Sequence, residues 1–405
     1  MTLSQKFHLQ GEVSESEKKK VSKAFDDLFG EANPEDLVFA SESEDELREI
    51  VELSNKLSSE FDSIIFVGTG ASYTIPKMYL DFAASHKTNF YYLRNFDVQQ
   101  LNAITTKLDP KKTAAILISK SGQTAEVVVN FLKLHEWIKK HVDEDEIKNH
   151  FITITEESPT ELFTIAETLG CTNFVHPHVG GRFAVFTVVG LLAASLGGFN
   201  IIKLMSSVKK VTDKLIKEKK SLIDSAVFYY ANYHEHKHHG MLSYGECFDG
   251  FNEWHSQLVF ESLGKNNSGV ASITSIGAYD QHIKLQYLLD GSKDLFCTLI
   301  HVKKFNQDLK IKNHTKIKAL NYYQKNTVNE VLNKNKNVVL ELLKQSNKSI
   351  REVTLNNINE EDIAGLIVRQ ILELMLLGFL NGINPFGQPA VQNIKSQIED
   401  ELKHG

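Results

Sequence analysis

The sequence is poor in cysteine: its 405 residues contain Cys171, Cys247 and Cys297, which lie far apart. Three widely spaced cysteines fit neither a disulfide framework nor a CxxC metal site. The sequence also lacks an excess of one charge, because 45 Lys and Arg oppose 51 Asp and Glu for a net charge of −6. We therefore expect neither nucleic acid nor an anionic membrane as its main partner.

The first 20 residues contain no apolar core of the kind that a secretion signal requires. Together with the scarce cysteines, this favours a cytoplasmic enzyme or binding protein. The composition, with 42% apolar and 24% charged residues, is typical of a globular protein. A chain of 405 residues is long enough for two domains.

One long uncharged run occupies residues 183–202, between Arg182 and Lys203. Its length would suffice to cross a bilayer. However, Gly190, Gly197 and Gly198 interrupt it, and its flanks carry no topology signal. We expect this run to be a helix buried between the layers of an α/β domain.

From about residue 46, segments with strand patterns alternate with segments with helical patterns. The expected strands include "SIIFVG", "NFYYLRNF", "AAILISK", "HFITITE" and "TNFVHPH". Between them lie helical segments such as "AEVVVNFLKLHEWIKKH", whose apolar residues recur at helical spacing. This alternation predicts α/β domains with mainly parallel sheets.

We expect four segments along the chain. They are an N-terminal helical cover (1–45), a first α/β domain (46–205), a second α/β domain (206–388) and a C-terminal helix packed across them (389–405). Within the second domain, the Lys- and Asn-rich segment 303–335 is expected to be a surface excursion, and the apolar helix "DIAGLIVRQILELMLLGFLNGI" to be interior.

Two of the expected strands end in small and hydroxyl-bearing residues: "FVGTGASY" (66–73) and "ILISKSGQT" (116–124). Ligands of parallel sheets collect at the carboxyl ends of strands, where helix N-termini attract phosphate. No GxxxxGK[ST] is present, so a nucleotide P-loop is not expected. A cradle of Ser and Thr with little fixed charge suits a phosphate monoester of a small sugar. Its candidate residues are Gly70, Ser72, Ser119, Lys120, Ser121 and Thr124.

"SKSGQTAE" (119–126) resembles a pattern of the phosphoglucose isomerase family. Four more stretches follow in that family's order: "GGRFAVFTVVGL" (180–191), "FNEWHSQLVFESLGK" (251–265), "IGAYDQHIKLQYLLDG" (276–291) and "NPFGQPAVQNIK" (384–395). The resemblance implies two flavodoxin-like, three-layer α/β/α domains of the sugar-isomerase (SIS) type. It also implies interconversion of glucose 6-phosphate and fructose 6-phosphate without metal or cofactor.

An aldose–ketose isomerase opens the sugar ring and then moves a proton between two adjacent carbons through a cis-enediolate. One carboxylate can take and return that proton. The resemblance implies that Glu261 is this base, and Gln257, four residues earlier on the same helical face, would help to bind the substrate. Arg182 is the candidate group that stabilises the negatively charged enediolate.

For ring opening, the resemblance implies His282 and Lys395, with Gln388 as a further substrate-binding residue. In relatives the histidine reaches into the neighbouring subunit's site, which implies a homodimer. The chain departs from the family's patterns at Ala71, which replaces a glycine, at Gln392, which replaces a glutamate, and at Phe260, where a small residue is usual. An alanine at residue 71 would be strained if that position required a positive φ.

Two alternatives remain open. One is an SIS isomerase that also accepts mannose 6-phosphate, and the other is a non-catalytic sugar-phosphate sensor. Glu261, His282 and Lys395 together argue against the sensor, which would need only the phosphate cradle. The stretch "HEHKHH" (234–239) lacks a carboxylate or cysteine partner at metal-ligand spacing and is expected to be an exposed helix end or loop.

Overall fold

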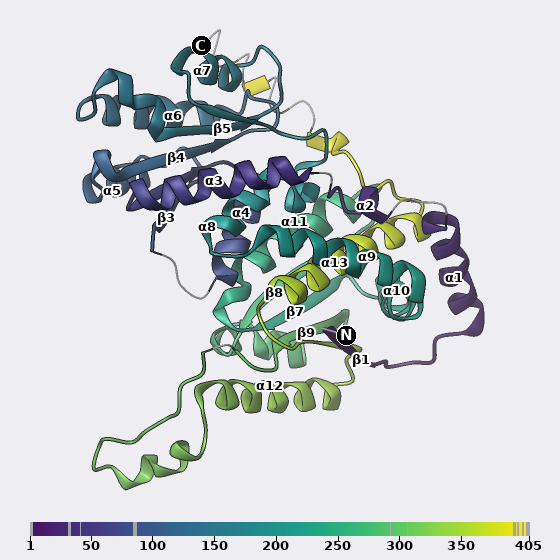
Figure 1. Ribbon diagram of the computed structural model, residues 1–405. Coiled ribbons are helices and arrows are strands. Elements are labelled where there is room, and N and C mark those ends of the chain that lie inside the picture. Colours follow the sequence, from purple (N-terminus) through teal and green to yellow (C-terminus); the bar gives the residue numbers. More distant parts are fainter. Residues whose placement is uncertain are drawn as a thin grey trace. The chain divides into compact units, whose positions relative to one another are not determined.

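A computed structural model describes residues 3–30, 34–40, 42–83, 87–291, 293–305, 307–391, 394, 397–398 and 401. The chain divides into two compact units. Unit 1 comprises Met1–Val38 and Lys203–Pro385, and unit 2 comprises Phe39–Ile202 and Phe386–Gly405. Each unit is built around its own five-stranded sheet (Figure 1).

The sheet of unit 2 is entirely parallel and has the strand order β3-β2-β4-β5-β6. Counted along the chain, this is the 2-1-3-4-5 order of flavodoxin-like folds, which confirms the expected fold class. The strands are β2 (Ser63–Val67), β3 (Asn89–Leu93), β4 (Thr113–Ile118), β5 (Phe151–Thr155) and β6 (Thr172–Val175).

Helices cover both faces of this sheet. On one face, Ile65 and Leu117 pack against Phe131 and Leu134 of α6 in a cluster that also includes residues of α5 and α7. Alternate strand residues, such as Phe66, are buried on the other face, where α3 and α4 pack against α8. The helices are α3 (Glu44–Glu60), α4 (Ala71–Phe82), α5 (Val98–Lys107), α6 (Ala125–Lys139), α7 (Glu161–Leu169) and α8 (Val188–Leu196), with 3₁₀ helices η1 (Pro110–Lys112), η2 (Glu144–His150), η3 (Gly181–Phe186) and η8 (Pro389–Val391).

The long uncharged run is buried within unit 2, as expected, but it is not one helix. It forms η3 and α8, which are separated at Thr187, whose side chain caps α8 by accepting a hydrogen bond from the Val189 amide. A Cβ at Gly190 would lie only 2.0 Å from the Val185 carbonyl oxygen, so glycine permits this close turn.

The sheet of unit 1 has the order β8-β7-β9-β10-β1. Its four parallel strands repeat the 2-1-3-4 order, and β1 pairs antiparallel with β10 at the edge. The strands are β1 (Leu3–His8), β7 (His238–Tyr244), β8 (Ala271–Gly277), β9 (Leu295–Val302) and β10 (Ile350–Leu355). The N-terminal segment, for which a helical cover was expected, contains α1 but also a strand, because "LSQKFH" completes this sheet.

Helix α12 covers one face of this sheet through Leu340 and Leu343, which pack on Leu242 and Leu299. The other helices of the unit include α10, α11 and α13, which pack together away from α12 (Figure 1). Unit 1 contains α1 (Glu15–Phe29), α2 (Pro34–Leu37), α9 (Ile201–Glu218), which begins at the unit boundary, α10 (Lys220–Tyr233), α11 (Asp249–Leu263), α12 (Val328–Gln345) and α13 (Glu360–Leu380), with the shorter turns η4 (Glu246–Phe248), η5 (Tyr279–His282), η6 (Tyr287–Gly291) and η7 (Lys318–Lys325).

Helix α13 is long and apolar enough to cross a membrane by length and composition, but 94% of its most apolar window is buried inside the protein. It is a core helix, as expected. The surface excursion ends earlier than expected, because Thr327 and Glu330 form a capping box that starts α12 at Val328.

Candidate active site

The two loops predicted to hold phosphate lie at neighbouring strand ends. Strand β2 pairs in parallel with β4, so the loops that follow them leave the same edge of the sheet. In the 2-1-3-4-5 order, these two strands flank the point where the order reverses, at which ligands of such sheets bind. The predicted placement of the two strand ends is confirmed.

The first loop depends on two glycines. A Cβ at Gly68 would lie 2.7 Å from the Ser72 Cβ, and Gly70, which precedes α4, has a φ of +54°. Ser72 lies half-buried in the first turn of α4. Ala71 is the first helical residue and has no positive φ, so the strain considered for it is absent. The positive φ belongs to the glycine before it.

The second loop is fixed by its own hydroxyl groups. The Oγ of Ser119 and the Oγ1 of Thr124 share a buried hydrogen bond of 2.7 Å. Gly122 turns the chain with a φ of +68°, and its amide donates to the Ser119 carbonyl oxygen at 3.1 Å. Thr124 is the N-cap of α6, and Ser121 lies half-buried in between. The loop therefore directs hydroxyl groups and a helix N-terminus to one place, which suits an anion.

Lys120 lies beside a carboxylate that the sequence did not single out. Its Nζ is 3.6 Å from an Oε1 of Glu156, which also lies 3.2 Å from the Nδ1 of His178. Glu156 directly follows β5, so the rule that functional groups gather at the carboxyl ends of parallel strands could have found it.

Arg182 is buried, with 2% of its surface exposed. Its Nη2 donates to the Gly387 carbonyl oxygen at 3.3 Å, and its guanidinium lies over the Phe183 ring at 4.9 Å. A Cβ at Gly181 would lie 3.4 Å from the Cβ of Ala71, so the loop that carries Arg182 packs on the start of α4.

Gln388 is half-buried in the turn that follows Gly387, whose φ is +70°. The ring of Phe386 fixes this turn by packing against Phe39 and Phe183. The structure thus brings the turn of Gln388 to Arg182. Lys395 and Gln392 lie outside the described residues.

In unit 1, Gln257 and Glu261 lie on one face of α11, as their spacing predicts. The Nε2 of Gln257 donates to the Oε1 of Glu261 at 2.8 Å, and both side chains are half-buried. Trp254, earlier on the same helix, is fully buried, whereas Phe260 is 46% exposed. The amide of Gln257 therefore orients a carboxylate that remains accessible.

His282 ends the turn η5 and is exposed. The residues before it hold the turn in place: the Asp280 carboxylate accepts hydrogen bonds from the Ile276 amide at 2.7 Å and the Lys284 Nζ at 3.1 Å. The Nε2 of Gln281 donates to the Tyr244 hydroxyl at 3.0 Å. A fixed backbone thus presents an accessible imidazole.

Comparisons with known proteins agree with one another. A family model described as phosphoglucose isomerase matches residues 50–405. A glucose-6-phosphate isomerase of Campylobacter jejuni is 30% identical over 82% of this chain and 82% of its own. A probable glucose-6-phosphate isomerase of Methanococcus maripaludis is 29% identical over 84% of this chain and 78% of its own. The crystal structure of a glucose-6-phosphate isomerase from Chlamydia trachomatis has the same fold, with a TM-score of 0.78 at 15% identity over 100% of this chain and 89% of its own.

Proposed function

Because the chain belongs to the phosphoglucose isomerase family, we propose that it catalyses the reversible isomerisation of D-glucose 6-phosphate and D-fructose 6-phosphate. It is an intramolecular aldose–ketose isomerase of glycolysis and gluconeogenesis. The reaction opens the sugar ring, moves one proton between C1 and C2 through a cis-enediolate, and closes the ring again.

The phosphate of the substrate binds to the loops that follow β2 and β4. Ser72, Ser119, Ser121 and Thr124 offer hydroxyl groups, and the N-terminus of α6 adds its partial positive charge. Gly70 allows the backbone to approach the ligand closely. Lys120 contributes positive charge at the same edge, and Gln388 binds the sugar or its phosphate.

Glu261 transfers the proton between the two carbons. The observation that carries this assignment is the 2.8 Å hydrogen bond from Gln257, which orients the half-buried carboxylate for use as the base. A single fixed carboxylate above the plane of the enediolate can reach both carbons. Gln257 is therefore a positioning residue as well as a substrate-binding one.

Arg182 stabilises the negative charge that develops on the enediolate. Its burial lowers the local dielectric and strengthens this interaction, and its hydrogen bond to Gly387 fixes the guanidinium before substrate binds. His282 and Lys395 serve as the acid–base groups that open the ring.

The protein acts as a homodimer in which His282 serves the partner subunit's site. The side chains around His282 support this: Tyr279 and Ile283 are 65% and 58% exposed, which is unusual for apolar groups beside a functional residue. The excursion of residues 303–327 also carries exposed apolar side chains, among them Leu309 at 70% and Tyr322 at 62%. A partner subunit would cover such groups.

The enzyme works in the cytoplasm. Its cysteines support this location, since Cys171, Cys247 and Cys297 are all free thiols. A reducing compartment keeps thiols in that state.

Turnover of fructose 6-phosphate by the purified wild type and by Glu261→Gln tests the assignment. We expect the substitution to lower kcat about 10²- to 10⁴-fold, because it removes the base and keeps the side chain's shape. Glu253→Gln, which makes the same change elsewhere on α11, is the control and should retain turnover near that of the wild type. Absence of turnover in the wild type would exclude the activity, and an active Glu261→Gln would displace Glu261 as the base.

A further inference from the structure

A network of hydrogen bonds joins four elements in the interior of unit 1. The guanidinium of Arg351 (β10) donates to the carboxylate of Glu373 (α13) at 2.8 and 2.7 Å. Its Nε donates to Gln5 (β1) at 2.6 Å, and the Gln5 amide donates to Ser221 (α10) at 3.4 Å. Arg369 (α13) completes the network by donating to the carbonyl and hydroxyl oxygens of Ser221 at 3.1 and 2.9 Å.

This network carries an excess positive charge. Two guanidinium groups share one carboxylate, since Arg369 also lies 3.6 Å from Glu373. Arg351 is 0% and Arg369 4% exposed. Burial, above all, and the charge of Arg351 together lower the pKa of Arg369 to about 10, although Glu373 opposes the shift. A buried charge without its own counter-ion is costly, so this arrangement favours a bound anion.

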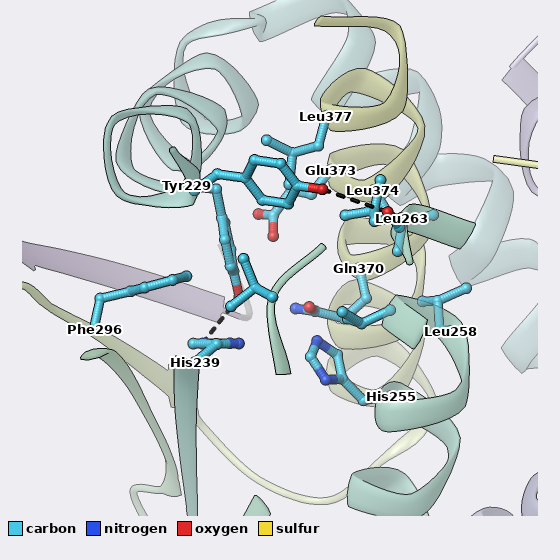
Figure 2. Close-up of a pocket in the computed structure, with 13 residues that line it drawn as sticks. Tyr229, His239, His255, Leu258, Leu263, Phe296, Gln370, Glu373, Leu374 and Leu377 are labelled. Carbon is cyan, nitrogen blue, oxygen red and sulfur yellow. Dashed lines mark hydrogen bonds between the residues drawn. The ribbon is translucent and has the colours of Figure 1, made fainter. Parts of the chain in front are cut away.

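On one side of Glu373, no described side chain supplies a second negative charge. A cavity of about 30 Å³ lies there. Figure 2 shows His239, His255 and Gln370 projecting toward it. Among the described residues, Glu373 is the only carboxylate that lines it. Burial, above all, lowers the pKa of His255 to about 4 and that of His239 well below its usual value, so both imidazoles are neutral at pH 7. His239 lies in β7 at 2% exposure, so the expectation that the whole of "HEHKHH" is an exposed end or loop was wrong.

A larger pocket lies beside Arg369. Its volume is about 180 Å³, well above the roughly 10–15 Å³ that one water molecule needs. The Arg369 Nε is buried and has no hydrogen-bond partner among the described residues. The hydroxyl of Ser221 accepts from Arg369 and can donate its own proton to a ligand. The charged side chains that line the pocket are Lys210, Lys214, Arg369, Glu218 and Glu361, which sum to +1.

We propose that this pocket binds a small oxyanion, namely a phosphate or carboxylate group on a molecule of a few carbon atoms. The Nε–H of Arg369, which has no partner among the described residues, can donate to an oxygen of such a group. Lys210 and Lys214, one turn apart on α9, add charge at the pocket's surface. None of the described residues assigned to catalysis lines this pocket, so we treat it as a second anion site with its own ligand.

Calorimetric titration of the full chain with inorganic phosphate and with malonate tests this site. The Ser121→Asp variant is the background, because a carboxylate in the loop after β4 repels phosphate from the first site. In that background we expect phosphate or malonate still to bind. Lys210→Gln should weaken this binding about fivefold, and Glu361→Gln should strengthen it by a similar factor, since each changes one charge at the pocket.

Lys217→Gln is the matched control, because Lys217 is exposed on the same helix but does not line this pocket. Tighter binding of phosphate would indicate a phosphorylated ligand, and tighter binding of malonate a carboxylate. Loss of all binding in Ser121→Asp would overturn the proposal, as would Lys210→Gln and Glu361→Gln variants that bind like Lys217→Gln. If the loop after β4 does not bind phosphate, Ser121→Asp will bind phosphate as the wild type does. Lys210→Gln will then still weaken phosphate binding at the second site.

Discussion

Gly122 is required in the loop after β4 for two separate reasons. Its φ is +68°, and a Cβ there would lie 1.9 Å from the Oγ1 of Thr160. Gly170 offers a comparison, because its φ of +65° is nearly the same but no atom lies within 4 Å of the Cβ position. Alanine at Gly170 therefore meets only backbone strain, whereas alanine at Gly122 must also move the loop.

We expect Gly170→Ala to lower the free energy of unfolding by about 1 kcal/mol and to leave the KM for fructose 6-phosphate unchanged. Gly122→Ala should cost roughly 2–4 kcal/mol and raise that KM, because the displaced loop misplaces Ser119 and Thr124. Urea unfolding and steady-state kinetics measure the two effects. Equal KM values in the two variants would show that the loop's shape does not matter for the substrate.

The individual residues of the candidate site were partly predictable from the sequence. The sequence predicted that Ser119 lies near Thr124 and Gln257 near Glu261, because the spacing of residues along one loop or one helix determines their neighbours; the roles proposed for Gln257 and Glu261 came from the family resemblance. It did not identify Glu156, whose partners Lys120 and His178 come from other parts of the chain. Contacts between distant segments depend on the packing of whole elements, which local patterns do not record.

The same distinction holds for secondary-structure elements. The alternation of strands and helices from β2 to β6 was predicted, because each of these strands is a short apolar run with turn residues at its ends. Strand β1 was not predicted. It is a polar edge strand that is stabilised by contacts with β10, such as the hydrogen bond from Arg351 to Gln5. The local sequence does not indicate such contacts between distant segments. Helices α9 and α10 are separated at Lys219, whose φ is +49°, and no local sequence signal indicates this break.

Helix α12 is attached to the sheet of unit 1 by a buried ionic cluster. The Nζ of Lys336 lies 2.5 Å from an Oε1 of Glu352 in β10, and the Nε2 of His301 lies 3.3 Å from the same oxygen. Hydrogen bonds from His301 and Lys336 lower the pKa of Glu352 from 4.5 to about 2. Since the folded-state pKa is below the unfolded value, the cluster stabilises the fold fully above pH 4.5, and this stability is lost as the pH falls from 4.5 to 2.

We expect Lys336→Met to lower the free energy of unfolding at pH 7 by about 3 kcal/mol, because it leaves a buried carboxylate without its main partner. The loss of stability between pH 4.5 and 2 should also become smaller, since the pKa of Glu352 then rises toward its usual value. Chemical unfolding measured across this pH range tests both effects.

Lys344→Gln is the control, because it removes the more exposed ion pair with Glu341 on the same helix. It should change the free energy of unfolding by at most about 0.5 kcal/mol. An equal effect of the two substitutions would contradict the role of the buried cluster.

At the scale of the whole molecule, the two units use one topology for different tasks. Both have the 2-1-3-4 order of parallel strands. In unit 2, the proposed phosphate site lies in the loops after the first and third strands. In unit 1, the first strand, β7, leads through a short turn into α11, which carries Gln257 and Glu261. A repeated fold therefore does not imply a repeated site, because the side chains on the loops and helices determine the chemistry.

The proposed exchange of His282 between subunits predicts that two inactive variants restore each other's activity. In a mixed dimer of Glu261→Gln and His282→Ala, the subunit with the His282→Ala substitution keeps its Glu261 and receives an intact histidine from its partner. Random assortment makes half of the dimers mixed, and one of their two sites is complete. Equimolar mixing after dissociation should therefore restore about a quarter of the wild-type turnover.

Each variant mixed with itself is the control and should stay inactive. If His282 acts within its own subunit, every site in the mixed dimer lacks one of the two groups, and mixing restores nothing. A protein that remains monomeric in sedimentation while turning over fructose 6-phosphate would exclude the exchange altogether.

Tyr279 and Ile283 are exposed beside His282, so a partner subunit would contact them. We expect Ile283→Glu to weaken the dimer and to lower turnover in proportion to the fraction of monomer.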